Sequence, residues 1–246
     1  MRVGLIATAV VASFFLFGLA TQVNAAPVTN KPIQPGAPLG WGYPAWCTQG
    51  FIFRDTAGTW YGSTAAHCYN VGDFVINTQA GDWFGQVVVS DATIDFALFK
   101  IFSDKVALVS PSVRHWGGPT GTATPADVQV NDRVAIFGYP LGTGDGYPVA
   151  NANLNYAEGR LGLARGISNG LALYTGPDIN GDSGGPLLLH KNGLAFGLVA
   201  ATHINSDDLA NPALDEGPSI QTAISRMAAA GYSLTLQTAP FYPVPL

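Results

Sequence analysis

The sequence is poor in charged residues and in cysteine, and it has no run of basic residues. Only 11% of its 246 residues are charged, against about 25% in an average globular domain. Apolar residues make up 48%, and because disordered chains combine high charge with low hydrophobicity, this composition favours a folded chain. With a net charge of −5, the chain is not expected to bind nucleic acid.

The scarcity of cysteine also excludes several kinds of site. Two cysteines, Cys47 and Cys68, are too few for a disulfide-dense scaffold or a cysteine-rich zinc or iron–sulfur site. The four histidines are not spaced like metal ligands. The acidic stretch from Asp178 to Asp182 is followed by neither the glycine nor the glutamate of a calcium loop. We therefore expect neither a metal nor a cofactor.

The first 26 residues are typical of a secretory signal peptide. Arg2 precedes an uncharged apolar run over residues 3–20, and the segment ends in Ala25-Ala26. A positive start, an apolar centre and a small-residue exit are the parts of a cleavable signal. The alternative is an uncleaved anchor, because a run of this length can just span a bilayer. We expect cleavage, a secreted extracellular protein with no membrane attachment, and an oxidising environment for the cysteines.

Beyond the signal, the sequence consists largely of short segments with the composition of β-strands. An extended lead-in rich in Pro and Gly covers residues 27–46. The expected strands, each bounded by Gly, Pro, Asn or Asp, are Gly50–Arg54, Phe74–Asn77, Phe84–Val89, Phe96–Phe102, Arg133–Tyr139, Leu171–Thr175, Leu187–His190 and Leu194–Thr202. Many short strands separated by turns indicate an all-β sandwich or barrel.

One segment near the C-terminus has the spacing of a helix. Apolar residues recur every three or four positions over residues 220–228, and Gly231 offers a left-handed stop. We expect a helix over residues 218–232 and a tail with little regular structure over residues 233–246. No internal repeat is present.

Three short motifs contain residues with catalytic chemistry. They are Thr64-Ala65-Ala66-His67-Cys68, Asp95-Phe96-Ala97-Leu98 and Gly181-Asp182-Ser183-Gly184-Gly185-Pro186. Each alone has an ordinary structural interpretation, as a packed histidine, a turn aspartate or a hairpin loop. Together they supply the parts of nucleophilic acyl transfer, because a neutral imidazole activates a serine hydroxyl and a carboxylate fixes the imidazole tautomer. The glycines also let the N–H groups of Gly181 and Ser183 point at one spot, where an oxyanion can be held.

In this order the three motifs resemble those of the chymotrypsin-like (trypsin-like) serine endopeptidases. The resemblance spans residues 47–231, and the segment Phe137-Gly138-Tyr139-Pro140 is more similar to the bacterial secreted members. It implies an all-β fold of two six-stranded antiparallel β-barrels with a C-terminal helix, and a site between the barrels. Residues 110–128 lack periodicity and hold many breakers. The first barrel is therefore expected over residues 47–120 and the second over 121–217.

The resemblance also implies a role for each motif residue. His67 falls on the general base, Asp95 on the orienting carboxylate and Ser183 on the nucleophile. The N–H groups of Gly181 and Ser183 fall on the oxyanion hole. Asp91 is a nearby alternative to Asp95, although only Asp95 stands in the family's motif.

Further implications concern the cysteines and Asp182. The resemblance implies a disulfide between Cys47 and Cys68, and two buried free thiols are the alternative. No Ile-Val-Gly-Gly sequence precedes Cys47, which argues against insertion of a newly cut N-terminus beside Asp182. Asp182 then needs another partner, and Arg160 and Arg165 are both candidates.

The substrate pocket is expected to contain Asp178, Thr202 and His203. A carboxylate at Asp178 would favour Lys or Arg before the scissile bond, with support from Asp215 and Glu216. His203 with Thr202 would favour an acidic side chain, because glutamyl endopeptidases use a histidine and hydroxyls for that purpose. If Asp178 is merely solvated at the rim, an apolar or small side chain would be preferred.

The sequence therefore predicts a secreted serine endopeptidase that acts as a monomer on protein or peptide substrates through an acyl-enzyme. One alternative is a secreted, non-catalytic binding protein on the same fold. It stays open because family members often support the catalytic aspartate with a serine where residues 198–202 here read Leu-Val-Ala-Ala-Thr. The other alternative is an esterase, but the Gly-x-Ser-x-Gly elbow of α/β-hydrolases belongs to the reverse chain order.

Overall fold

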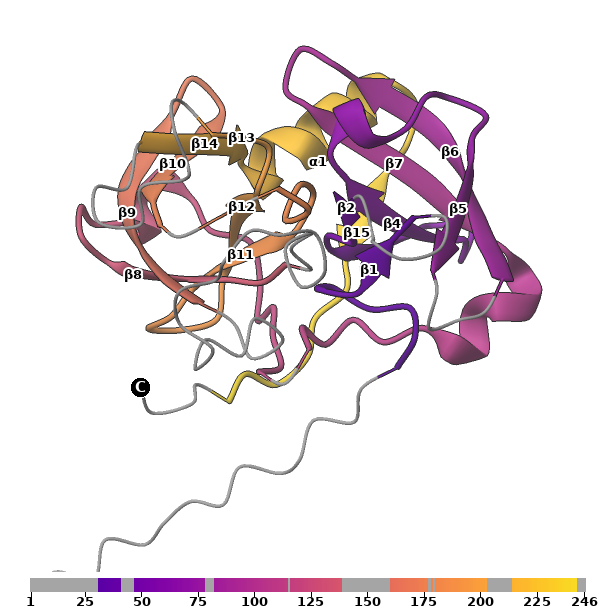
Figure 1. Cartoon of the computed structure of the whole chain (residues 1–246), viewed down its shortest axis with the longest axis horizontal. Coiled ribbons are helices and arrows are strands. Elements are labelled where there is room, and N and C mark those ends of the chain that lie inside the picture. The colour runs from indigo at the N-terminus through magenta and orange to yellow at the C-terminus, as the bar shows by residue number, and fades with distance from the viewer. Residues whose placement is uncertain are drawn as a thin grey trace, which may run out of the picture.

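The computed structural model describes residues 31–40, 47–77, 82–114, 116–138, 160–176, 178, 180–202 and 214–242. These residues form two large antiparallel sheets, a small two-stranded sheet and one α-helix. The two large sheets curve into separate bodies that lie side by side, with the helix at the junction between them (Figure 1). The predicted fold class, two antiparallel β-barrels with a C-terminal helix, is confirmed.

The first sheet has six strands in the order β15-β3-β4-β7-β6-β5. Its strands are β3 (Ile52–Asp55), β4 (Trp60–Thr64), β5 (Phe74–Asn77), β6 (Asp82–Asp91), β7 (Phe96–Ile101) and β15 (Leu234–Leu236). In β7 every residue except Lys100 is buried, as expected for a central strand covered on both sides. Phe84 and Phe99 meet edge to face in the core of this sheet.

The second sheet has seven strands in the order β12-β11-β8-β9-β10-β14-β13. They are β8 (Arg133–Ile136), β9 (Arg160–Ser168), β10 (Leu171–Thr175), β11 (Pro186–Leu189), β12 (Ala195–Leu198), β13 (Ala201–Thr202) and β14 (Leu214–Pro218). The two-residue β13 is added at one edge to six longer strands. The core of this sheet includes Tyr174, Leu187 and Phe196, all fully buried.

The helix α1 (Ile220–Ala229) joins the two sheets. The Ser219 hydroxyl accepts a hydrogen bond from the Thr222 N–H and caps the helix. The buried face of α1 enters a core cluster that also contains Phe53 of the first sheet and Leu198 of the second. Burial of one helical face between two sheets therefore makes the sheets a single packed unit.

The remaining elements are short. They are β1 (Pro38–Leu39), β2 (Cys47–Thr48) and the 3-10 turns η1 (Ala66–Cys68), η2 (Ser103–Leu108) and η3 (Pro125–Asp127). Strand β1 pairs with β2, so part of the expected lead-in is in fact ordered against the first barrel. Within the described residues, no helix is long and apolar enough to cross a membrane.

The tail prediction needs a correction. Residues 234–236, assigned to a tail with little regular structure, form β15 and pair with β3. Leu234 and Leu236 are buried while Thr235 is exposed, which is the alternation of a strand with one covered face. An alternation of three residues shortly after a helix is too short to be recognised as a strand from the sequence.

Candidate active site

His67 and Asp95 lie together because their strands are neighbours. Strand β4 leads into η1, which carries His67, and Asp95 directly precedes β7. These strands are antiparallel, with Thr64 opposite Ala97. The C-terminal end of β4 and the N-terminal end of β7 therefore lie side by side, and both residues lie at this end of the strands. The His67 Nδ1 lies 2.7 Å from Asp95 Oδ2, and the His67 backbone N–H donates to Asp95 Oδ1 at 2.9 Å. The carboxylate thus holds both the ring and the backbone of the histidine.

The backbone on either side of this contact is fixed locally. Asp95 has a positive φ of 52°, a conformation that aspartate tolerates better than most residues with a side chain. Cys68 follows His67 and forms a disulfide with Cys47 of β2, with the two Cα atoms 6.3 Å apart. This confirms the expected disulfide and excludes the alternative of two free thiols.

The contact changes the acidity of both groups. The hydrogen bond to Asp95 raises the pKa of His67 above its ordinary 6.5, although partial burial acts in the opposite direction. Burial by itself would raise the pKa of Asp95, but hydrogen bonds from the His67 ring and backbone bring it below 3.8. Asp95 is therefore ionised at neutral pH, and it favours the His67 tautomer with a proton on Nδ1.

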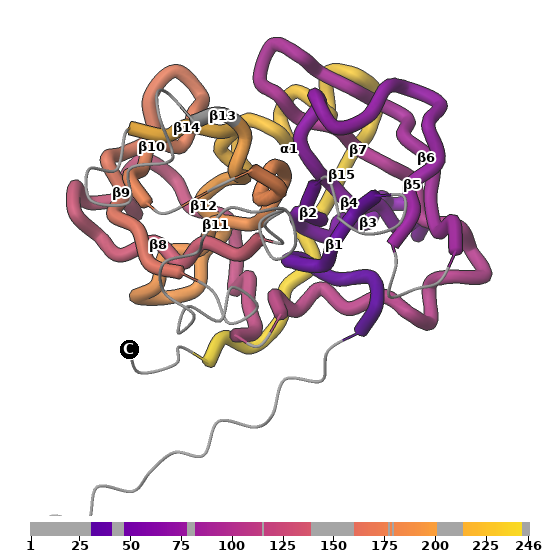
Figure 2. The backbone as a smooth tube through the Cα atoms, viewed as in Figure 1, coloured from indigo at the N-terminus to yellow at the C-terminus, as the bar shows by residue number. Residues whose placement is uncertain are grey.

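The turn that carries Ser183 belongs to the second sheet, immediately before β11, and packs on the first. Thr48 of β2 donates from its N–H to the Ser183 carbonyl at 2.8 Å and from its hydroxyl to the Gly181 carbonyl at 2.7 Å. β2 lies at the junction of the two bodies, as the backbone trace shows (Figure 2). Ser183 is thereby tied to the strand that also carries Cys47.

Gly184 brings this turn directly against the His67 segment. Its φ is 85°, and a β-carbon there would overlap the Thr64 hydroxyl and the Thr48 carbonyl and lie 2.8 Å from the Ala65 nitrogen. Only glycine permits this approach. Ser183 is thus placed next to the segment that ends two residues later in His67.

The N–H groups of Gly181 and Ser183 are suited to bind an anion. Gly181 has a φ of 98°, which turns its peptide relative to the following residues. Within the described residues, neither N–H donates to a backbone acceptor. Unused donors at one tight turn are what an oxyanion hole requires.

Asp182 is buried under this turn and pairs with Arg160. The Arg160 Nη2 lies 2.6 Å from Asp182 Oδ1, and both side chains are almost completely buried. Arg165, the other candidate, instead bonds Asn131 and Thr175. A residue of β9 therefore supplies the counter-charge of Asp182.

Asp91 is not the partner of His67. Its Oδ2 lies 2.5 Å from the Arg226 Nε of α1, so it ties the helix to the end of β6. This contact excludes Asp91 as the orienting carboxylate. Neither Thr48 nor Arg226 was predicted as part of the site surroundings, because each acts through a contact with a residue more than 130 positions away.

Several solved structures have a similar architecture. Thermobifida fusca Protease A matches over 84% of this chain and 98% of its own, with 22% identity and a TM-score of 0.57. A glutamic acid specific serine protease matches over 83% and 100%, with 14% identity and a TM-score of 0.58. Nocardiopsis protease (NAPase) matches over 84% and 99%, with 16% identity and a TM-score of 0.54.

These neighbours are bacterial chymotrypsin-like serine proteases. The chain has the chymotrypsin-like fold. No model of a protein family matches the sequence, and a search among curated proteins finds no relative.

The expected substrate pocket of this chymotrypsin-like fold is only partly described. Asp178 is 2% exposed, and its Oδ2 accepts a hydrogen bond from the Tyr174 hydroxyl at 2.8 Å. The alternative of a solvated Asp178 at the loop rim is therefore wrong. Thr202 lies in β13 opposite Asp215 of β14, and His203 falls outside the described residues. Tyr174 was missed by the sequence analysis, because a tyrosine in a strand is ordinarily read as core.

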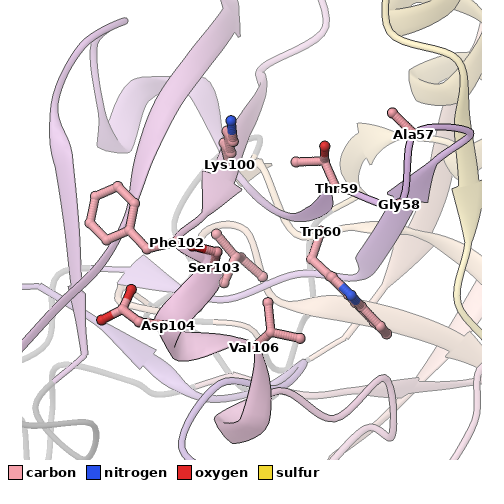
Figure 3. Close-up of a pocket in the computed structure, with 10 residues that line it drawn as sticks. Ala57, Gly58, Thr59, Trp60, Lys100, Phe102, Ser103, Asp104 and Val106 are labelled. Carbon is pink, nitrogen blue, oxygen red and sulfur yellow. The ribbon is translucent and has the colours of Figure 1, made fainter.

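A separate depression lies at the other end of the first barrel. It has a volume of about 570 Å³ and is lined by residues including Trp60, Lys100, Phe102, Asp104 and Val106 (Figure 3). Strands β4 and β7 extend from this depression to the strand ends that carry His67 and Asp95. The depression therefore lies away from the paired residues of the candidate active site.

Proposed function

We propose that this protein is a secreted serine endopeptidase in which His67, Asp95 and Ser183 act on peptide bonds. The observation that carries the proposal is the two-point contact between His67 and Asp95, at 2.7 and 2.9 Å. The Ser183 turn packs against the segment leading into this histidine. The three motifs that resemble one family in sequence are thus neighbours in space.

The geometry supports the following division of roles. His67, neutral and with its Nδ1 proton held by Asp95, accepts the hydroxyl proton of Ser183 at Nε2 while the Ser183 oxygen attacks the substrate carbonyl. The N–H groups of Gly181 and Ser183 stabilise the oxyanion of the tetrahedral intermediate, each contributing about 2.7–4 kcal/mol. The imidazolium then gives its proton to the leaving amine, and water hydrolyses the acyl-enzyme by the same route.

Covalent labelling tests this function directly. The purified mature protein should be labelled by an organophosphonate at Ser183, whereas a non-catalytic binding protein would remain unlabelled. Hydrolysis of a peptide library compared with simple esters then separates an endopeptidase from an esterase. Secretion is tested by detecting, in the culture medium, the mature protein whose N-terminus begins after the signal peptide.

Activity should rise with pH as His67 loses its proton. Because Asp95 raises the pKa of His67 above 6.5, kcat/KM should increase through neutral pH rather than reach its plateau below pH 6. The measurement is kcat/KM on one peptide substrate from pH 5 to 8. His190→Gln is the matched control, because His190 packs on Trp116 and its loss should leave the acidic limb in place. A flat profile would contradict a histidine base.

Preference for Lys or Arg before the scissile bond is the second expectation for this site. Asp178 lies five residues before Ser183, and within the described residues no Lys or Arg forms an ion pair with it. Asp178→Asn should therefore lower kcat/KM for Arg peptides by about tenfold or more relative to Phe peptides. Asp104→Asn, in the distant depression, serves as the control. An unchanged Arg-to-Phe ratio would contradict a basic preference set by Asp178, and preferential cleavage after Glu would favour the acidic alternative.

A further inference from the structure

Two aspartates meet in the buried part of the second sheet, directly before the nucleophile turn. Asp215 lies in β14 opposite Tyr174 of β10, and Asp178 follows β10 by three residues. Each aspartate is 2% exposed. A carboxylate this well buried needs either a cation or hydrogen-bond donors, because desolvation strongly disfavours its charge.

The contacts of Asp178 indicate a shared proton. Asp178 accepts from the Tyr174 hydroxyl at 2.8 Å, and its carboxyl group interacts with that of Asp215. Two ionised carboxylates offer only acceptors and repel each other, so a buried contact between them favours one proton held by the pair. Burial, followed by the charge of Asp178, raises the pKa of Asp215 to about 8. Burial raises the pKa of Asp178 as well, so the pair as a whole retains a proton at neutral pH.

The surrounding charges do not replace this proton. Arg160 of β9 is engaged with Asp182 at 2.6 Å. Asp182 adds a further negative charge that acts on both Asp178 and Tyr174. Arg165 bonds Asn131 and Thr175 instead, and β13, the other neighbour of β14, consists of Ala201–Thr202.

Two further titratable groups complete the surroundings. Burial and the charge of Asp178 raise the pKa of Tyr174 well above 10, so its hydroxyl stays a donor. Glu216 follows Asp215 in β14, and because successive strand residues point to opposite faces, it lies on the other face of the sheet from Asp215. Among the described residues, no cation is ion-paired with Asp178 or Asp215.

We infer that Asp178 and Asp215 share one proton, and that this proton positions the turn carrying Ser183, so that its loss at alkaline pH switches off the proposed hydrolysis. The inference rests on the proposed function. Asp178 and Ser183 lie at opposite ends of one short segment. The Ser183 end is anchored by Thr48 and, through Asp182, by Arg160. The Asp178 end is anchored by Tyr174 and the shared proton, and ionised Asp215 would repel it.

The first test is the alkaline limb of kcat/KM. A group with a pKa of about 8 keeps its proton in about 3% of molecules at pH 9.5, so wild-type kcat/KM should fall about thirtyfold between pH 7 and pH 9.5. Asp215→Asn still donates to Asp178 but cannot ionise, so its profile should stay level over this range. Asp178→Asn leaves the Asp215 carboxyl buried but removes the charge of Asp178, so its alkaline limb should move to lower pH. Asp104→Asn is the control that should retain it.

The second test does not depend on catalysis and uses the Ser183→Ala protein. The unfolded chain releases the Asp215 proton near 3.8, whereas the folded chain keeps it to about 8. The free energy of unfolding should therefore fall as pH rises through this window. Adding Asp215→Asn should remove that part of the fall, and the comparison cancels the contribution of His67.

The two tests separate the possible failures. A wild-type protein that hydrolyses nothing at any pH would overturn the proposed function, and the unfolding experiment would still judge the proton pair. Equal pH dependence of unfolding with and without Asp215→Asn would overturn the shared proton. An alkaline limb that persists unchanged in both Asp215→Asn and Asp178→Asn would overturn its positioning role.

Discussion

Replacement of Ser183 by alanine is expected to lower kcat on a peptide substrate by about five to six orders of magnitude, because triad members act as a unit. The Ser183 carbonyl, which accepts from Thr48, is unchanged by the substitution. The Gly181 and Gly184 geometry also does not depend on the serine hydroxyl. The fold should therefore be retained, as measured by circular dichroism and the denaturation midpoint.

The control for this prediction is an exposed serine of the helix, Ser225. The Ser225 hydroxyl of α1 donates to the Gln221 carbonyl one turn earlier, so Ser225→Ala should keep full activity and full organophosphonate labelling. A pure Ser183→Ala sample that retained more than about a tenth of wild-type activity would remove Ser183 from the nucleophile's role.

The second large effect is expected at Arg160. Arg160→Met removes one partner of a fully buried ion pair and leaves the Asp182 carboxylate without its cation. Breaking a buried pair in this way costs about 3–5 kcal/mol, a large share of the stability of an ordinary domain. The measurement is urea unfolding at pH 7, and catalysis should fall together with stability because Asp182 immediately precedes Ser183.

Arg165→Met is the matched control for Arg160→Met. Both residues lie in β9, but Arg165 makes exposed contacts with Asn131 and Thr175, so its loss should change the free energy of unfolding by less than about 1 kcal/mol. The double variant Arg160→Met with Asp182→Asn should recover part of the lost stability, because no charge is then left unpaired. Equal destabilisation by the two arginine substitutions would show that the Arg160–Asp182 pair does not hold the turn.

The resemblance of the three motifs was enough to predict two antiparallel barrels and a C-terminal helix, and the alternation of Asp95–Ile101 was enough to place β7. Helical spacing over residues 220–228 likewise placed α1. These features could be read from the sequence because each depends on a local period or on a short fixed string. Strands β4 and β9 were not recognised as strands, since glycines interrupt their apolar pattern.

The sequence by itself determined which residues were candidates for chemistry. His67, Asp95 and Ser183 stand in recognisable motifs, and the resemblance to the family implied the disulfide between Cys47 and Cys68. The motif favoured Asp95 over Asp91 without showing a contact, and nothing in the sequence decided between Arg160 and Arg165. Each contact depends on which side chain reaches which atom.

Tertiary structure alone showed these contacts. Antiparallel pairing of β4 with β7 brings Asp95 to His67, while packing of α1 brings Arg226 to Asp91. The arrangement of β9 gives Arg160 to Asp182, and the pairing of β10 with β14 places Asp215 opposite Tyr174, whose hydroxyl bonds Asp178. Charges this far apart in the sequence acquire partners only when strands place them at hydrogen-bond distance. Their protonation is also set by burial, which no local pattern records.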